Sequence, residues 1–134
     1  MEGLNTRAER RLRDELIIWL TTVSPSGQPQ TSAVWFLWDG ADFLIYSLPG
    51  TARTRNIEAN PRVSLNLDGD GQGGSVVTIE GEARIDLGGP ASKEVPEYSA
   101  KYRDKIAGYS WTPESFAVDY PIAIRITPTR ARSW

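Results

Sequence analysis

The sequence predicts a mainly β protein in which six antiparallel strands close into a small barrel with a few flanking helices. Six segments are dense in β-branched and aromatic residues, as strands are. Short turn sequences join the first three of them, including Ser24–Pro29 and Asp39-Gly40. One helical segment separates the third strand from the fourth. A closed barrel fits this order better than an open sheet, because closure leaves no exposed strand edge.

The totals describe an ordinary globular chain. Its length of 134 residues predicts a single domain spanning residues 1–134. The net charge of −2 predicts no general attraction to nucleic acid or to an anionic membrane. No apolar run reaches the roughly 20 residues that a membrane span needs. Residues 1–14 are highly charged and lack the apolar core of a secretory signal, so we expect a cytoplasmic protein.

The chain contains no histidine and no cysteine. This excludes histidine-based triads, cysteine nucleophiles and the usual zinc and haem ligands. The segment Asp68–Gly71 comes nearest to a calcium loop but lacks its remaining ligands, so we expect no metal site. No side chain is singled out as catalytic. If the protein is an enzyme, a bound organic cofactor is expected to supply the reactive group.

The elements follow in order along the chain. Apolar residues four apart, at Leu4, Ala8, Leu12 and Leu16, predict an N-terminal helix that packs on the outside of the sheet. The six strands are expected at Leu16–Val23, Gln30–Trp38, Asp42–Ser47, Val63–Leu67, Ser75–Ile85 and Pro121–Pro128. Gly81, inside the fifth, predicts a bulge or a barrel corner.

Two helices are expected between the fifth and sixth strands. The first spans Ala91–Ile106, where Pro96 indicates a break or a start and Gly108 is a natural C-cap. The second is short, with Thr112 as its N-cap and Pro113 at its first position.

The helix between the third and fourth strands predicts an anion site. Thr51 is its expected N-cap, and Asn60-Pro61 ends it after about two turns. Its N-terminus exposes free N–H groups and carries partial positive charge. Arg53 and Arg55 in the first turn oppose the helix dipole, and a bound anion would relieve that conflict. We interpret the segment as a phosphate site; the alternative is that both arginines are solvated.

The aromatic residues leave more alternatives open. Trp35 and Trp38 lie on opposite faces of one predicted strand, so only one of them can point inward. The tyrosines are possible proton donors, but none is singled out, and packing is the simpler interpretation for them. Trp111 and Trp134 lie outside the strands and could line a pocket or an interface.

The order of these pieces resembles the split β-barrel flavin-binding family related to pyridoxamine 5′-phosphate oxidase, the FMN-binding split barrel. More closely, it resembles the actinobacterial branch that binds the deazaflavin coenzyme F420. The resemblance covers Leu16–Ile85 well and the last strand loosely. Its most specific part is RTRNI at 53–57 with NPRV at 60–63, followed by IEGEA at 79–83.

The resemblance implies a homodimer with two cofactor sites at the subunit interface. It implies that the phosphate is held by Arg53, Thr54, Arg55 and Asn56, with Arg53 foremost. Ser47, Leu48 and Pro49 would lie beside the ribityl chain or the phosphate, and the strand residues Ser32, Ala33, Val34 and Trp35 along the ring system. The partner subunit would close the pocket with Gly74, Ser75, Val76, Arg132 and Trp134.

The resemblance also implies a function, an F420-dependent oxidoreductase that transfers a hydride between the deazaflavin and a small unsaturated or quinone-like molecule. One alternative is an FMN-dependent oxidoreductase. Another is a non-catalytic carrier or sensor of F420, FMN or a related tetrapyrrole. Oxidation of pyridoxamine phosphate is not expected, because the histidine of the oxidase's C-terminal substrate site is absent and Arg130–Trp134 resembles that tail only vaguely.

Overall fold

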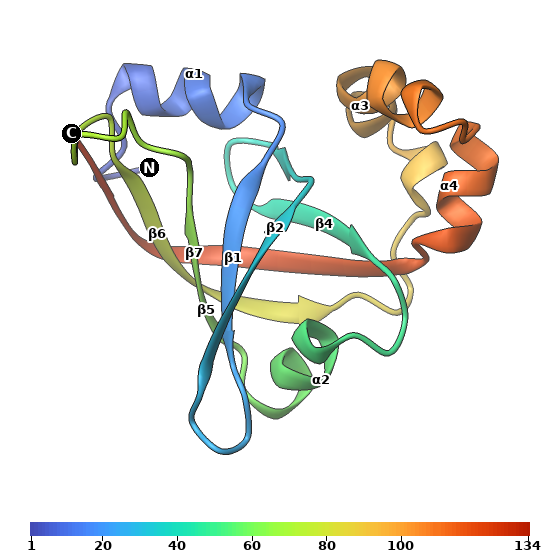
Figure 1. Ribbon diagram of the computed structural model, residues 1–134, viewed down its shortest axis with the longest axis horizontal. Helices are drawn as coiled ribbons and strands as arrows, with labels where there is room; N and C mark the ends of the chain where they lie inside the picture. Colours follow the sequence, from blue (N-terminus) through green and yellow to red (C-terminus); the bar gives the residue numbers. More distant parts are fainter.

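The computed structural model describes residues 1–134 and contains one antiparallel sheet that curls into a half-barrel (Figure 1). Its strands are β1 (Ile18–Val23), β2 (Pro29–Val34), β3 (Leu37–Trp38), β4 (Phe43–Ser47), β5 (Arg62–Asn66), β6 (Val77–Ile85) and β7 (Ile122–Ser133). Their order across the sheet is β2-β1-β5-β6-β7-β4-β3, and each neighbouring pair is antiparallel. The predicted mainly β, split-barrel class is confirmed, but the sheet remains open between β2 and β3 where closure of the barrel was expected.

The sheet has seven strands where six were expected, because the predicted strand Gln30–Trp38 is two strands. β2 ends at Val34 and β3 begins at Leu37. β2 and β3 are consecutive in the chain, yet they form the two opposite edges of the sheet. The sheet therefore curls until its edges approach at Trp35 and Phe36, and the barrel stays split there.

Helices flank this sheet on several sides. They are α1 (Thr6–Asp14), α2 (Ala52–Ala59), the 3₁₀ turn η1 (Ser92–Glu94), α3 (Pro96–Gly108) and α4 (Pro113–Asp119). Figure 1 shows α1 on one side of the molecule, α3 and α4 together on the other, and α2 at the lower end. None of them combines the length and apolar character that crossing a bilayer requires.

Several boundaries differ from those predicted. Pro96 starts α3, and Ala91–Val95 is an extended segment with the 3₁₀ turn because proline cannot donate to a preceding helical turn. Gly108 is the last helical residue, and Tyr109 is the cap. β7 continues to Ser133, well beyond Pro128, because its polar second half pairs with the first half of β6.

Gly81 lies at the predicted bulge. The pairing of β6 with β7 shifts register between Glu80 and Gly81. A Cβ atom at Gly81 would lie 2.8 Å from the Thr127 carbonyl oxygen and 2.9 Å from Ile126 Cγ2. Only glycine therefore lets the two strands approach this closely at the corner.

The strands divide the buried side chains into two apolar clusters. The main core fills the inside of the curled sheet and includes Trp38, Phe43 and Ile45. The second cluster lies between the other face of β4 and the helices α3 and α4, and it includes Tyr46 and Tyr98. β4 is consequently buried on both faces. Trp35 packs against the second cluster and Trp38 belongs to the main core, as their opposite parity predicted.

Side chains of α3 hold the open corner of the barrel. The Phe36 N–H donates to the Tyr102 hydroxyl at 2.8 Å, and the Phe36 carbonyl accepts from Lys101 Nζ at 2.9 Å. These two backbone groups are bonded to side chains and not to a neighbouring strand. The Trp35 ring stacks on Tyr102, with centroids 4.8 Å apart and planes 4° from parallel. The break in the predicted strand thus depends on helix α3.

Lys101 gives this corner a dependence on pH. Its ammonium lies 3.8 Å from the centre of the Phe36 ring, and it forms no ion pair with a carboxylate. Burial lowers the pKa of Lys101 from 10.5 to about 8. The folded state therefore binds this proton more weakly than the unfolded state, and the contribution of Lys101 to stability rises with pH from about 8 to 10.5.

We expect Lys101→Met to be more stable than the wild type at pH 7, because methionine keeps an apolar stem without the buried charge, and the Phe36 carbonyl still has the Tyr102 hydroxyl at 3.0 Å as a partner. The advantage should shrink as the pH rises through this window, because the wild-type side chain becomes neutral. Urea unfolding of both proteins at pH 7 and at pH 10 measures the difference. An advantage that stays constant or grows with pH would contradict the assignment to the charge.

Candidate functional site

Arg53 is a half-buried cation without a countercharge in the chain. It projects from the first turn of α2, just after the N-cap Thr51. Its Nε donates to Ser32 Oγ at 3.3 Å on β2, and its Nη1 donates to Ser47 Oγ at 3.1 Å at the end of β4. It forms no ion pair, and burial lowers its pKa. Two neutral hydroxyls do not compensate a partly desolvated guanidinium, so an anion would bind here favourably.

Two hollows meet at Arg53. The first, which we call the polar hollow, has a volume of about 230 Å³. Its lining consists mainly of hydroxyl and amide side chains from β1, β2 and the start of α2: Thr22, Gln30, Thr31, Ser32, Thr51, Ala52 and Arg53. Free N–H groups at the start of α2 add to its attraction for anions. This hollow has the chemistry of a phosphate site.

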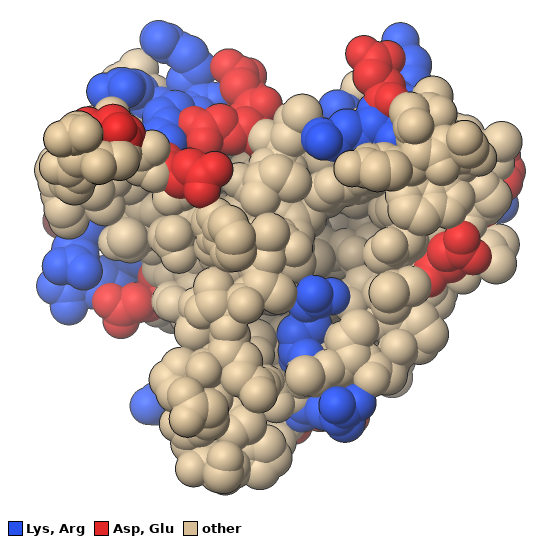
Figure 2. Space-filling view, in the orientation of Figure 1, with Lys and Arg blue, Asp and Glu red and all other residues tan.

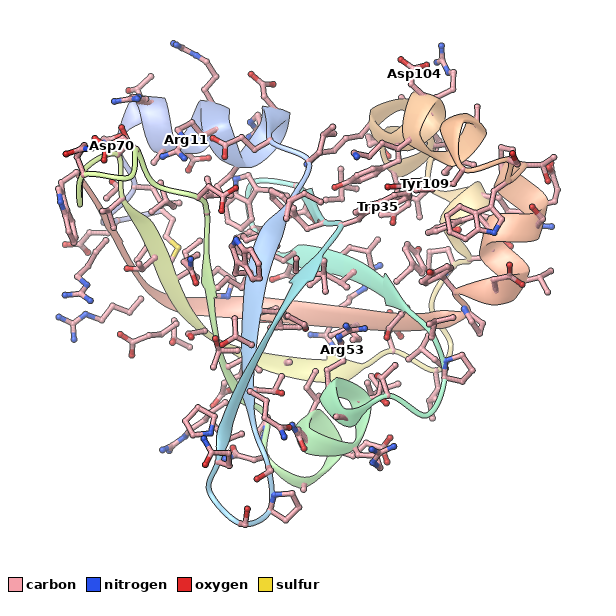
Figure 3. All side chains as sticks on the ribbon, in the orientation of Figure 1. Arg11, Trp35, Arg53, Asp70, Asp104 and Tyr109 are labelled. Carbon is pink, nitrogen blue, oxygen red and sulfur yellow. The ribbon has the colours of Figure 1, made fainter.

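The second hollow, which we call the aromatic pocket, has a volume of about 360 Å³. It is lined by Ala33, Val34, Trp35, Tyr46, Leu48, Arg53, Tyr98, Tyr109, Trp111, Phe116 and Tyr120. Arg53 is the only charged group in this lining, and no carboxylate contributes to it. Figure 3 shows Arg53 across from Trp35 and Tyr109, and Figure 2 shows the hollow in this face with basic side chains at its lower edge. The pocket therefore suits a planar, conjugated, uncharged or anionic group.

Most of the residues expected along the ring and the phosphate meet at these hollows. Ser32 and Ser47 bond directly to Arg53. The side chains expected beside the ring, together with Leu48, line the aromatic pocket: Ala33, Val34, Trp35 and Leu48. Pro49 is exposed in the turn before α2 and lines neither hollow.

The other residues of α2 have different partners. Asn56 is buried, and its Nδ2 donates to Thr22 Oγ1 at 2.9 Å and to Gln30 Oε1 at 2.8 Å, which fastens α2 to two side chains of the polar hollow. Thr54 is buried and donates to the Thr51 carbonyl at 2.8 Å. Arg55 is exposed, donates to the Gly50 carbonyl at 2.6 Å and lines neither hollow. Arg53 is thus the arginine that faces both hollows.

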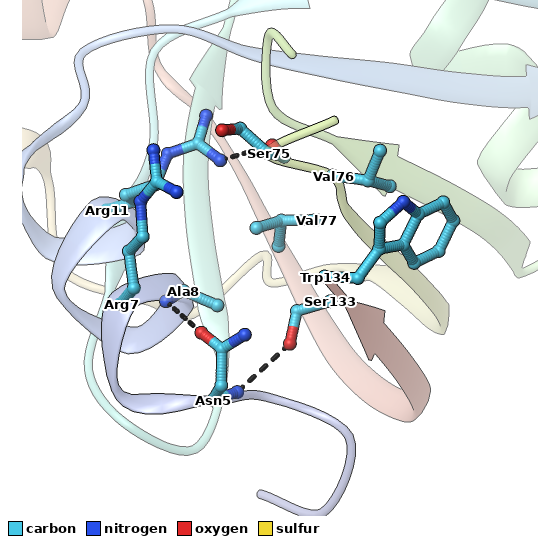
Figure 4. Close-up of a pocket in the computed structure, with 9 residues that line it drawn as sticks. All are labelled: Asn5, Arg7, Ala8, Arg11, Ser75, Val76, Val77, Ser133 and Trp134. Atoms are coloured by element: carbon cyan, nitrogen blue, oxygen red, sulfur yellow. Dashed lines mark hydrogen bonds between the residues drawn. The ribbon is translucent and has the colours of Figure 1, made fainter. Parts of the chain in front are cut away.

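Ser75 and Trp134 lie apart from Arg53 within one chain. They line a small hollow of about 50 Å³ beside α1, together with Arg7 and Arg11 (Figure 4). The Ser75 carbonyl accepts from Arg11, and the backbone of Trp134 pairs with that of Val76 at 2.9 and 3.0 Å. The Trp134 side chain is 61% exposed, so it is free to meet another surface.

Sequence reasoning did not assemble the aromatic wall of the pocket. Sequence reasoning missed five of these residues as a set, and they come from α3, the turn after it, α4 and the residue that caps α4: Tyr98, Tyr109, Trp111, Phe116 and Tyr120. Trp111, for which a pocket and an interface were both open, lines the aromatic pocket. The available signal was the density of aromatic residues between positions 98 and 120, but their spacing does not predict a common cavity.

The hydroxyls in this wall differ in their bonding. Tyr46 Oη donates to the Pro90 carbonyl at 2.8 Å, and burial raises the pKa of Tyr46 to about 12. Tyr98 is fully buried, its hydroxyl has no partner, and burial raises its pKa further. Both phenols are therefore neutral at physiological pH. The Tyr46 hydroxyl already donates its proton to a backbone carbonyl, so it stabilises the fold.

The structure is thus a split antiparallel half-barrel in which an arginine without a countercharge lies beside an aromatic pocket. The family model for pyridoxamine 5′-phosphate oxidase matches residues 4–134. The chain belongs to this family, and the resemblance noted in the sequence is confirmed at that level.

Solved structures agree with the family. A protein described as an F420 reductase is 27% identical, with a TM-score of 0.69, over 98% of this chain and 97% of that chain. A conserved hypothetical protein from Mycobacterium tuberculosis is 24% identical, with a TM-score of 0.73, over 100% of this chain and 88% of that one. The heme storage protein HutZ from Vibrio cholerae shares the fold at 14% identity and a TM-score of 0.67, over 97% of this chain and 94% of that one. No curated protein matches the sequence.

Proposed function

We propose that the protein is an F420-dependent oxidoreductase that transfers a hydride between the deazaflavin and a small unsaturated or quinone-like molecule. The observation that carries the proposal is Arg53, a half-buried guanidinium held by two serine hydroxyls at the junction of the polar hollow and the aromatic pocket. A phosphate in the polar hollow would supply the missing negative charge. A planar ring attached to it would reach the aromatic pocket past the same side chain.

The residues present fit such a cofactor. Arg53 Nη2 bonds to no group of the chain, so the guanidinium has a donor to spare for an anion. The aromatic pocket lies within the usual size range of small-molecule sites, about 300–1,000 Å³, at about 360 Å³. Its lining has the large flat side chains on which a conjugated ring stacks.

Similarity to the F420 reductase supports F420 as the cofactor, because it extends over nearly the full length of both chains. FMN is the alternative, since it also joins a planar ring to a phosphate. A second alternative is a non-catalytic carrier or sensor of F420, FMN or a tetrapyrrole, and the fold shared with a heme storage protein keeps it open. The chain has no histidine or cysteine to serve as an axial haem ligand, which favours a metal-free ligand.

In this proposal the protein's own residues bind, orient and shield. A reduced deazaflavin, when bound, supplies the hydride. Arg53, Ser32 and Ser47 would hold the phosphate and so set the position of the ring along β2. The aromatic wall from α3 and α4 would place an acceptor against the ring and keep water away.

A second subunit would complete this site. Leu48 and Tyr109 both line the aromatic pocket, and they are 43% and 63% exposed. Exposed apolar and aromatic side chains around one pocket are typical of an interface. We propose a homodimer in which the partner's Trp134 and Ser75 approach the pocket, as the family resemblance implies.

Titrations of the purified protein with F420 and with FMN test the proposal. We expect F420 to bind more tightly, and reduced F420 to be reoxidised when the quinone menadione is added. Tighter binding of FMN than of F420 would support the alternative, an FMN-dependent oxidoreductase. Binding without turnover of several enone and quinone acceptors would support the carrier or sensor, and binding of neither cofactor would refute the proposal.

A further inference from the structure

The aromatic pocket shares one wall with a third hollow. This outer hollow is lined by residues of α3, the turn after it and the start of α4, and it has a volume of about 290 Å³. Trp111 lines both the aromatic pocket and the outer hollow, and it is the only residue common to the two. The indole is therefore the partition between them.

This partition is held in place from several directions. Trp111 Nε1 donates to Asp119 Oδ2 at 3.0 Å, and the Trp111 backbone N–H donates to the Ile106 carbonyl at 3.0 Å. Its ring packs edge-on against Phe116 and Tyr120, with centroids 5.4 and 5.5 Å away. These contacts fix both ends of the residue, so the indole acts as a wall and not as a loose side chain.

The chemistry of the outer hollow differs from that of the aromatic pocket. Its lining includes Arg103 as the one charged side chain, with small and apolar residues around it. Arg103 is exposed and forms no ion pair. A ligand that extended from the aromatic pocket into this hollow would therefore do best with an acidic group at its far end.

We propose that Trp111 determines specificity by limiting the length of the acceptor: compact conjugated molecules fit the aromatic pocket, and longer ones with an acidic end are excluded by the indole. The inference rests on the proposed function, because it takes the aromatic pocket as the place where the acceptor lies against the cofactor ring. Removing the indole would join the two hollows and bring Arg103 within reach of a longer ligand.

Two quinones probe this directly. Menadione is the compact probe, and anthraquinone-2-sulfonate is one fused ring longer and carries an anionic end. Calorimetric titrations would compare the wild type, Trp111→Ala and Tyr109→Ala. Tyr109 is the matched control, because it is an aromatic residue that lines the aromatic pocket but not the outer hollow.

We expect Trp111→Ala to bind the longer probe at least roughly ten-fold more tightly than the wild type does, the scale on which apolar pockets discriminate by size. Its preference for the longer probe over menadione should rise by a similar factor. Tyr109→Ala should weaken binding of both quinones by a similar factor and so leave that preference unchanged, and adding Arg103→Gln to Trp111→Ala should reduce the gain. Trp111→Phe, a smaller change with less risk to folding, should give an intermediate gain.

An unchanged preference in both folded Trp111 variants would overturn the inference, as would failure of the wild type to bind menadione. A separate F420 titration of each variant distinguishes this failure from that of the proposed function. If F420 binds and the preference does not change, only the role of Trp111 is refuted. If the preference changes and F420 does not bind, only the cofactor assignment is refuted.

Discussion

Replacing Arg53 by alanine is expected to weaken binding of F420, the proposed cofactor, by roughly 100-fold, or about 3 kcal/mol, since charge-assisted hydrogen bonds contribute most at a half-buried site. The ligand-free protein should keep its stability or gain slightly, because the guanidinium is partly desolvated and has no carboxylate partner. Calorimetric titration and thermal unfolding of the same sample measure the two effects. Weaker binding without lost stability is the signature of a residue kept for its ligand.

Arg55→Ala is the matched control for this experiment. Arg55 lies on the same turn of α2 and carries the same charge, but it is exposed and bonds to the Gly50 carbonyl. Its removal should change cofactor affinity by no more than roughly three-fold, because an exposed charge at that distance is screened. Equal losses in the two variants would mean that the site depends on total charge and not on the placement of Arg53.

Tyr102→Phe is expected to lower the free energy of unfolding by about 2–3 kcal/mol, because it leaves buried backbone groups without a partner. The Tyr102 hydroxyl accepts from the Phe36 N–H at 2.8 Å and lies 2.8 Å from the Leu16 carbonyl, to which it donates. Phenylalanine keeps the ring and its stacking on Trp35 but offers neither bond. Denaturant unfolding monitored by tryptophan fluorescence measures the loss, which for a chain of this size corresponds to roughly 3–5 °C in Tm per kcal/mol.

Tyr98→Phe makes the comparison specific to the hydroxyl. Tyr98 is as fully buried as Tyr102, and the two ring centres are 4.9 Å apart. Its hydroxyl, however, has no partner. Its removal should therefore leave stability unchanged or raise it slightly, because an unsatisfied buried hydroxyl is itself unfavourable. Similar losses in both variants would contradict the assignment of the effect to the hydrogen bonds of Tyr102.

Local patterns predicted most of the elements. Thr51 and Asn60-Pro61 delimit α2 because capping and proline effects act within a few residues. Gly81 indicated the bulge because a glycine inside a strand is itself the sign that the backbone leaves no room for a Cβ atom at that position. The break after Val34 escaped prediction for the opposite reason. Gln30–Trp38 has strand-forming residues throughout. The backbone N–H and carbonyl of Phe36, however, form hydrogen bonds with the side chains of Tyr102 and Lys101, which lie more than 60 positions away in the sequence.

By itself the sequence determined the mainly β class and the position of the helix that carries Arg53 and Arg55. Both follow from short-range preferences of strand-forming and capping residues, and the two cations at a helix N-terminus distinguished this segment from the rest of the chain. Only the tertiary structure separated Arg53 from Arg55 and gathered aromatic residues of three segments into one pocket. It also made Trp111 the wall between two hollows. Those properties depend on which distant side chains meet when the sheet curls, and no local pattern carries that information.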